Sequence, residues 1–402
     1  MENISGLFCT LARIPSPSMK EDAVLEKIKE ILTVWNISHR QDACGNIYAS
    51  IPATDEGKQP LALSAHTDVV GDFSPVNLVF SDDGKTVGTD KTRTLGADDK
   101  AGVAAAMWLA KELAEDKTLK HGGLEIILTR DEERGMTGAS SLEFDQIKSE
   151  YVLVLDSDRL GDLPVAGASY TKLFVSVHSV KSGHSGLDIG DETRVNAAKL
   201  IADLVSALPN GVYKADETGV VTSLNIGAIA AGGIQNASSD LQGADYLSFL
   251  TQNAMSNVIN ADAFALYSIR SSEVDTEEKL KRDILKIAEG FNEKYAGLAT
   301  ICADFETHLL PFERSEDTTV IDVVTEAAEK QGIEVNISSF HAGAETHIYA
   351  HKRNAAGKKF KPYLFGIADV YNMHSPEEHM DLPSLHKGSA LLKEVFLTFN
   401  RR

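Results

Sequence analysis

Apolar residues in the first 160 positions form two patterns, one typical of helices and one typical of buried strands. Residues 21–35 carry apolar side chains at helical spacing, and the Ala-rich segment 101–113 also predicts a helix. Three short apolar runs, 61–65, 124–129 and 151–155, predict strands buried on both faces. A further helix is expected at 136–144. Alternating helices and buried strands predict an α/β fold with a mostly parallel sheet.

The pattern changes in the middle of the chain. Strands are expected at 172–180, 220–228, 261–270 and 300–307, and helices at 194–208 and 276–295. This mixture predicts a smaller α+β domain. Beyond Pro311, a helix at 319–331, a strand at 363–367 and a final helix at 382–399 return to the α/β pattern. The simplest architecture is a catalytic domain of residues 1–169 and 311–402, interrupted by an inserted domain at 170–310.

Composition and charge exclude several classes of protein. The 402 residues have a formal net charge of −20 and no cluster of Lys and Arg, so we expect neither a nucleic-acid partner nor an anionic membrane surface. No apolar run reaches the roughly 18 residues of a membrane span, and the first residues lack a signal-peptide pattern, which favours a cytoplasmic location. Three scattered cysteines support neither a disulfide scaffold nor a thiolate zinc site.

Acidic and histidine clusters follow the predicted strands of the first half. His66-Thr67-Asp68 follows the first strand, Asp131-Glu132-Glu133 the second and Asp156-Ser157-Asp158 the third, while Asp98-Asp99 opens the Ala-rich helix. Taken alone, each cluster is better explained as a solvated turn or a helix cap than as part of a site. Together they predict a single site, because in open α/β sheets sites form outside the carboxyl ends of the strands.

The order of these motifs resembles the signature of the di-zinc exopeptidase family that includes peptidase T, the Xaa-His dipeptidases, glutamate carboxypeptidase and the aminoacylases. The resemblance covers essentially the whole chain. Residues 95–102 and 155–158 look most like peptidase T, whereas residues 182–186, 341–343 and 374–376 are similar to the Xaa-His dipeptidases, so the subfamily stays open. The motifs that carry the resemblance are His66-Thr67-Asp68, Gly96-Ala97-Asp98-Asp99-Lys100-Ala101-Gly102, Glu132-Glu133, Leu155-Asp156 and Asn372-Met373-His374-Ser375.

The resemblance implies a centre of two divalent metal ions. Asp98 would bridge both ions, His66 and Asp156 would complete one site, and Glu133 and His374 would complete the other. Asp156 is preferred to Asp158 as the ligand because it directly follows the apolar strand. Three protein ligands and one solvent ligand for each ion give the open tetrahedral arrangement of catalytic zinc. Ligation by nitrogen and oxygen also tolerates Mn²⁺ or Co²⁺.

The resemblance also implies catalytic and structural roles for residues beside the ligands. Glu132 would be the general base, which takes a proton from the water that bridges the metals and so generates the attacking hydroxide. Asp68 would accept a hydrogen bond from His66 and orient its imidazole. His184, flanked by Gly183 and Gly186, would stabilise the oxyanion of the tetrahedral intermediate. Asp99 is implied to be structural, in a peptide with Asp98 that relatives hold in the cis form.

Substrate-binding residues are implied at three positions. Arg270 would grip a substrate carboxylate, for which a guanidinium is well suited. Asn257 begins the same family motif, in which Asn260 departs from the usual Pro. Gly343, in the motif His341-Ala342-Gly343, completes the predicted substrate-binding set. A carboxylate at Glu345 would bind the free amine of a peptide, which favours aminopeptidase specificity.

The sequence therefore predicts a metal-dependent hydrolase that cleaves the amide bond of short peptides, a di- or tripeptide aminopeptidase. An N-acyl amino acid deacylase using the same site is the alternative enzyme. A metal-dependent binding or scaffold protein that has lost activity is the alternative from another class. The family also implies that the inserted domain serves as a dimerisation or lid domain and that the protein forms a homodimer.

Overall fold

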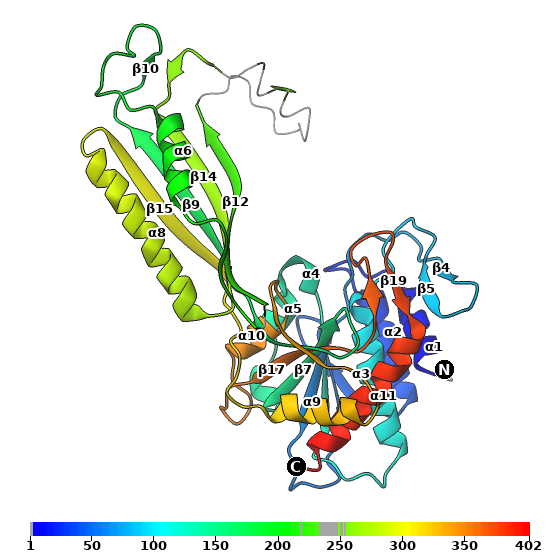
Figure 1. Ribbon diagram of the computed structural model, residues 1–402. Helices are drawn as coiled ribbons and strands as arrows, with labels where there is room; N and C mark the ends of the chain where they lie inside the picture. Colours follow the sequence, from blue (N-terminus) through cyan, green and yellow to red (C-terminus); the bar gives the residue numbers. More distant parts are fainter. Residues whose placement is uncertain (1–2, 218, 233–247, 250–251, 253–254) are drawn as a thin grey trace. The chain divides into compact units, whose positions relative to one another are not determined.

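The computed structural model describes residues 3–217, 219–232, 248–249, 252 and 255–402 (Figure 1). The chain divides into two compact units. The first contains Met1–Gly167 and Phe312–Arg402, and the second contains Ala168–Pro311. None of the helices within the described ranges has the length and apolar character needed to cross a membrane.

A six-stranded sheet forms the centre of the first unit. Four neighbouring strands, β6, β3, β7 and β17, run parallel, while β1 and β2 pair antiparallel at one edge. The predicted α/β class with a mostly parallel sheet is thus confirmed. In spatial order the strands are β1 (Ser38–Gln41), β2 (Ile47–Ile51), β6 (Leu124–Thr129), β3 (Leu61–His66), β7 (Tyr151–Ser157) and β17 (Lys361–Gly366).

The central strands are apolar on both faces because each face packs against its own core. In β3, Leu61 and Leu63 join one cluster of buried residues, whereas Ala62 between them joins a second cluster on the opposite face. The same alternation divides Leu153 from Val154 in β7. Burial on both faces explains why these strands are continuous apolar runs rather than alternating patterns.

Helices supply the cover for these cores. The long helices α3 and α11 contribute many buried side chains to the larger cluster, and α1, α2 and α9 add to it. The helices of this unit are α1 (Ile4–Ala12), α2 (Asp22–Val34), α3 (Ala97–Glu115), α4 (Glu132–Gly135), α5 (Thr137–Ser140), the 3-10 helix η1 (Phe144–Gln146), α9 (Thr319–Glu329), α10 (Thr346–Ala350) and α11 (Leu382–Phe399).

Two smaller sheets complete the first unit. An antiparallel sheet has the order β18 (Val370–Tyr371), β19 (His379–Asp381), β5 (Thr86–Thr89) and β4 (Leu78–Phe80). A parallel pair joins β8 (Asp162–Gly167) to β16 (Asn336–Phe340). The first of these sheets matters for the site, because the loop between β18 and β19 carries His374.

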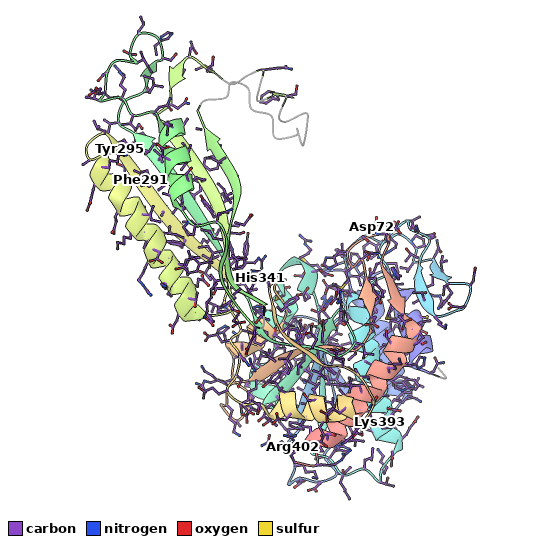
Figure 2. All side chains as sticks on the ribbon, viewed as in Figure 1. Asp72, Phe291, Tyr295, His341, Lys393 and Arg402 are labelled. Atoms are coloured by element: carbon purple, nitrogen blue, oxygen red, sulfur yellow. The ribbon has the colours of Figure 1, made fainter. Side chains whose placement is uncertain are left out.

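Among its described residues, the second unit has an antiparallel sheet and two helices. Alternate residues of β9 and β14 are buried and form a core with α6 and α8. Phe291 of α8 and Tyr295, which caps the end of this helix, add partly buried rings to the core (Figure 2). The sheet has the order β11 (Gly211–Asp216), β12 (Gly219–Ala231), β14 (Asp262–Ser271), β9 (Tyr170–Ser179) and β15 (Ala299–Leu309), and the other elements are β10 (Gly183–His184), β13 (Val258–Ile259), α6 (Ala197–Ala207) and α8 (Val274–Lys294).

The prediction of a helix at 136–144 is wrong. The segment instead contains the single helical turn α5 and a turn at Ser141, and the 3-10 helix η1 begins at Phe144. Met136 adopts a left-handed backbone with φ of 55°, which ends α4 before α5 begins. The carbonyl group of Gly138 also accepts a hydrogen bond from the Asn46 side chain, and a Cβ at Gly138 would lie 2.3 Å from the Arg130 carbonyl oxygen. The backbone at Gly138 packs against the backbone at Arg130 in place of a regular helix.

Candidate metal centre

Five side chains predicted as metal ligands come from different elements of the first unit. His66 ends β3, Asp156 lies near the end of β7 and Asp98 lies in the first turn of α3. Glu133 belongs to α4, directly after β6, and His374 lies in the loop between β18 and β19. Parallel strands bring their carboxyl ends to one edge of the sheet, which is why these distant segments meet.

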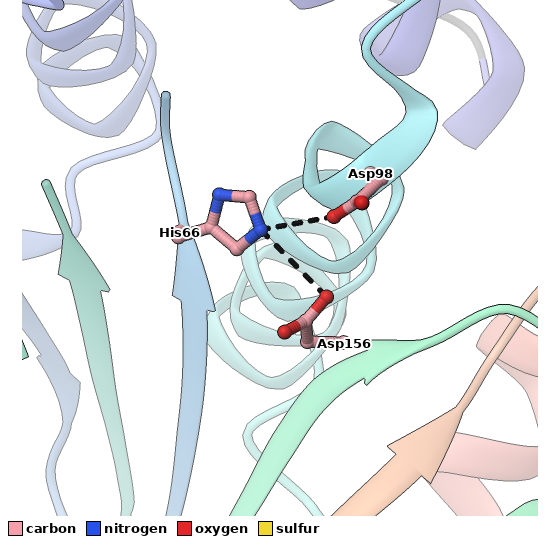
Figure 3. A group of neighbouring side chains, drawn as sticks. All are labelled: His66, Asp98 and Asp156. Carbon is pink, nitrogen blue, oxygen red and sulfur yellow. Dashed lines mark hydrogen bonds and ion pairs between the residues drawn. The ribbon is translucent and has the colours of Figure 1, made fainter. Parts of the chain in front are cut away.

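The side chains form two groups that share Asp98. His66 Nε2 lies 2.9 Å from Asp98 Oδ1 and 3.6 Å from Asp156 Oδ1 (Figure 3). His374 Nε2 lies 3.0 Å from Asp98 Oδ2 and 2.9 Å from Glu133 Oε1. Within each group the potential ligand atoms lie within 4.8 Å of one another. Each oxygen of Asp98 thus faces a different histidine, as a carboxylate shared by two ions requires.

The electrostatics of this cluster suit the binding of cations. Burial, and then the charge of Asp98, raises the pKa of Asp156 to about 7. Burial also opposes the charge on Asp98, but hydrogen bonds with His374 and His66 outweigh it and lower the pKa of this carboxyl group. The same contacts with Asp98 and Glu133 raise the pKa of His374 to about 10. These shifts reflect the close approach of carboxylates to one another and to two histidines, an arrangement that two divalent ions would stabilise.

Asp68 is buried behind the ligands and connects several of them. Its Oδ1 lies 3.3 Å from His66 Nδ1, and its backbone oxygen lies 3.0 Å from the same nitrogen. Oδ1 also accepts the backbone N–H of Glu132 at 2.9 Å, and Oδ2 accepts that of Glu133 at 3.2 Å. Ser18 donates its hydroxyl to Oδ2 at 2.7 Å. Asp68 therefore fixes both the imidazole of His66 and the backbone of the Glu132-Glu133 pair.

Glu132, the predicted base, belongs to neither ligand group. Burial is the main cause that raises the pKa of Glu132 well above its usual range. The positive charge of His66 opposes this shift, and the negative charge of Asp156 adds to it. A carboxyl group with a raised pKa beside candidate metal ligands is the arrangement expected of a group that exchanges protons with a substrate.

Asp99 has a structural position, as the resemblance implied. The Asp98–Asp99 peptide bond is cis. Asp99 is buried, and its carboxylate accepts the backbone N–H of His66 at 3.3 Å and that of Gly102 at 3.0 Å. A Cβ at Gly102 would lie 2.3 Å from Asp99 Oδ1, so glycine at this position leaves the space that the carboxylate occupies.

His184, Asn257 and Arg270 all belong to the second unit. Pairing of β10 with β13 places His184 opposite Val258, and the backbone oxygen of Asn257 accepts the N–H of Ser185 at 3.0 Å. His184 is exposed, and its Nδ1 accepts the N–H of Gly186 at 3.1 Å. Arg270 lies near the end of β14 with its guanidinium 4.9 Å from the centre of the Tyr170 ring. The fold thus brings His184 and Asn257 together across 73 residues of sequence.

Gly343 and Glu345 lie in the segment before α10 in the first unit. Gly343 is half-buried, whereas Glu345 is only 1% exposed. Ser64, two residues before His66, donates its hydroxyl to Glu345 Oε2 at 2.9 Å. The Glu345 carboxylate therefore lies within the core beside β3 in this structure, rather than on the surface where a peptide amine would first meet it.

Sequence reasoning missed Glu378. Glu378 is 2% exposed, and its carboxylate contacts the backbone that leads into Asp98. The sequence offered one signal, since Glu378 lies four residues after His374, but the neighbouring Glu377 makes this segment resemble an exposed charged turn.

Comparisons with known proteins identify a matching family and similar folds. The sequence profile described as Peptidase family M20/M25/M40 matches residues 62–398. The chain is 23% identical to peptidase T of Listeria monocytogenes over 396 residues, which span 98% of this chain and 85% of that protein. The crystal structure of aminopeptidase PepT from Bacillus cereus superposes with a TM-score of 0.81 at 22% identity, covering 99% of this chain and 98% of that one. The YXEP protein of Bacillus subtilis, described as a dinuclear metal-binding peptidase, gives a TM-score of 0.68 at 15% identity, with coverage of 99% and 98%.

Proposed function

The chain belongs to peptidase family M20/M25/M40 and is a metallopeptidase, and on this premise we propose that it is an aminopeptidase of di- and tripeptides. The observation that carries the proposal is the position of Asp98, whose two oxygens face His66 and His374 at 2.9 and 3.0 Å. The similarity to peptidase T and to aminopeptidase PepT supports the choice of short peptides with a free amine.

The donor set fits two divalent metal ions. Each group offers one imidazole nitrogen and carboxylate oxygens, without a thiolate, which suits Zn²⁺ and also Mn²⁺ or Co²⁺. We assign His66, Asp98 and Asp156 to one ion and Asp98, Glu133 and His374 to the other. The description of the YXEP protein as a dinuclear metal-binding peptidase supports two ions rather than one.

In the proposed mechanism the chain supplies a base, an orienting carboxylate and substrate contacts. When bound, the two ions lower the pKa of a water molecule and polarise the peptide carbonyl group. Glu132 takes the proton from this water and delivers it to the leaving amine. Asp68 holds the imidazole of His66 in the orientation that its hydrogen bonds define.

Residues of the second unit, together with Gly343 of the first unit, have proposed roles in binding and charge stabilisation. Arg270 holds the carboxylate of the peptide, for which its guanidinium offers two parallel donors. Asn257 and Gly343 contribute to the substrate site, and His184 donates to the oxyanion that forms at the carbonyl. We propose a homodimer that forms through the second unit, which acts as the dimerisation or lid domain. The cytoplasmic location stays a prediction.

An N-acyl amino acid deacylase is the alternative enzyme for the same centre. In the decisive assay, metal-reconstituted protein is incubated with di- and tripeptides in matched pairs, one with a free amine and one with an N-acetylated amine. The products are identified by mass spectrometry. The proposal predicts release of the first residue from the free-amine peptides only. Cleavage of the N-acetyl compounds alone would identify a deacylase.

A metal-dependent binding protein without activity is the alternative from another class. The presence of Glu132 beside a complete ligand set speaks against it, since a protein that only binds peptides has no use for a base. Binding of peptides by the two-metal protein without any cleavage would favour this alternative.

A further inference from the structure

Glu378 connects the loop that carries His374 to the segment that carries Asp98. It lies in the loop between β18 and β19, directly before His379, and its carboxyl group is buried. The segment that it contacts, Thr94–Asp98, runs into the first turn of α3. A single buried side chain thus joins two stretches of chain that are separated by 280 residues.

Both carboxylate oxygens of Glu378 accept hydrogen bonds. Oε1 accepts the backbone N–H of Ala97 at 2.8 Å and that of Asp98 at 3.4 Å. Oε2 accepts the N–H of Gly96 at 3.0 Å and the hydroxyl of Thr94. The first N–H groups of a helix have no partner within the helix, and a carboxylate that accepts them also complements the positive end of the helix dipole.

The helix α3 alone does not fix the backbone at Asp98, so hydrogen bonds from outside the helix, such as those to Glu378, are needed to hold it. Asp98 has a ψ of 106°, which is not helical, so the regular hydrogen bonds of α3 do not determine where its side chain points. On the other side of the centre, the side chain of His374 is 51% exposed, so packing does not fix it either. His374 also has a left-handed backbone with φ of 60°. Glu378 is attached to both segments.

We propose that Glu378 is a positioning residue of the metal centre, which sets the place of the bridging Asp98 relative to His374. The proposal rests on the two-metal function described above. Glu378 belongs to neither group of candidate ligands, and its carboxylate accepts hydrogen bonds from backbone N–H groups and Thr94 instead. Because Asp98 belongs to both ligand groups, misplacing it weakens both sites, whereas a change near His374 alone would weaken one.

Glu378→Gln tests this role with almost no change in shape. The amide replaces one acceptor oxygen with an NH₂ donor, and this donor then faces N–H or O–H groups that also donate. Loss of a group that orients metal ligands typically weakens metal binding about 10- to 100-fold. We expect a loss of this size at both sites, measured by competition between metal-stripped protein and a chromogenic Zn²⁺ chelator. Hydrolysis by the variant should recover as the metal concentration rises.

Glu125→Gln is the matched control. Glu125 accepts the backbone N–H of Lys148 at 3.0 Å and both the N–H and the hydroxyl of Ser149, at 2.8 and 2.6 Å. It makes the same kind of network as Glu378, but near the start of β6, away from the carboxyl end where the ligands gather. Its substitution should change thermal stability while leaving Zn²⁺ affinity within about threefold of the wild type, far less than a lost orienting group.

The outcomes separate this proposal from the proposed function. Wild-type protein that binds fewer than two ions would contradict the two-metal function itself. Two ions in the wild type, with the same affinity in folded Glu378→Gln, would overturn only the positioning role. If Glu378→Gln does not fold, Thr94→Val tests the positioning role instead. This variant removes one hydrogen-bond donor to Glu378 and keeps the carboxylate. Weaker Zn²⁺ binding in Thr94→Val supports the role, and wild-type affinity overturns it.

Discussion

His374 Nε2 lies 3.0 Å from Asp98 Oδ2, although the two residues are separated by 276 positions in the sequence. The other oxygen of Asp98 faces His66 at 2.9 Å. One carboxylate therefore lies between two histidines that come from the two separate chain segments of the first unit. In the proposed two-metal centre, both metal sites would therefore depend on Asp98.

Asp98→Ala should deplete both sites, whereas His374→Ala should weaken mainly one. The reason is that Asp98 is common to both ligand groups, while His374 belongs to one. Metal analysis of the two purified variants after dialysis measures the difference. Two full equivalents retained by Asp98→Ala would refute the shared role.

Glu132→Gln should keep both metals and lose most of the activity. Glu132 lies outside both ligand groups, and loss of a general base typically lowers kcat about 10²- to 10⁴-fold. Metal content and kcat are measured on the same preparation, with Glu133→Gln as the comparison. If Glu132→Gln loses a metal and Glu133→Gln does not, the two roles are reversed.

Asp68→Asn should lower metal affinity or activity about 10- to 100-fold without replacing a ligand. Its two oxygens accept the backbone N–H groups of Glu132 and Glu133, so an amide would turn one acceptor into a donor that faces them. Ser18→Ala is the control, because it removes one hydrogen bond to Asp68 and leaves the carboxylate in place. Asp68→Asn with wild-type metal affinity and kcat would show that Asp68 orients nothing essential.

His184→Ala should lower kcat about 10²- to 10³-fold with both metals bound, as expected for the loss of an oxyanion donor. In a two-fold dimer each subunit can lend the other a side chain, and the small residues Gly183 and Gly186 allow the His184 loop a close approach. Mixing the inactive His184→Ala chain with the inactive Glu132→Ala chain tests whether His184 acts in the active site of the partner subunit. Activity should partly return in verified heterodimers, because one of their two sites has both native groups. Heterodimers without activity, or a monomeric enzyme at assay concentration, would contradict it.

The strands that carry the ligands could be predicted because a short apolar run is a pattern that can be recognised from neighbouring residues alone. β3 and β7 are short apolar runs buried on both faces, and a His or Asp at the end of each run stands out. The resemblance of the ordered motifs to a known family then implied the roles of these residues. Asp156, rather than Asp158, joins His66 and Asp98 in the structure, as its position directly after the apolar run suggested.

Features that depend on contacts between distant segments could not be predicted. The broken helix after Met136 follows from a left-handed backbone and from contacts of Gly138 with Asn46 and Arg130, neither of which leaves a local pattern. Glu378 reads as a surface charge, because its partners at Gly96 and Ala97 are backbone N–H groups with no sequence signature.

A metal titration of stripped wild-type protein tests the central claim most directly. Zn²⁺ or Mn²⁺ is added stepwise, bound metal is measured at each step, and hydrolysis of a free-amine tripeptide is followed on the same samples. The account predicts that binding saturates at two equivalents and that the stripped protein regains hydrolysis as the ions bind. Hydrolysis by the stripped protein, or full activity and saturation at one equivalent, would contradict a centre in which Asp98 is shared by two ions.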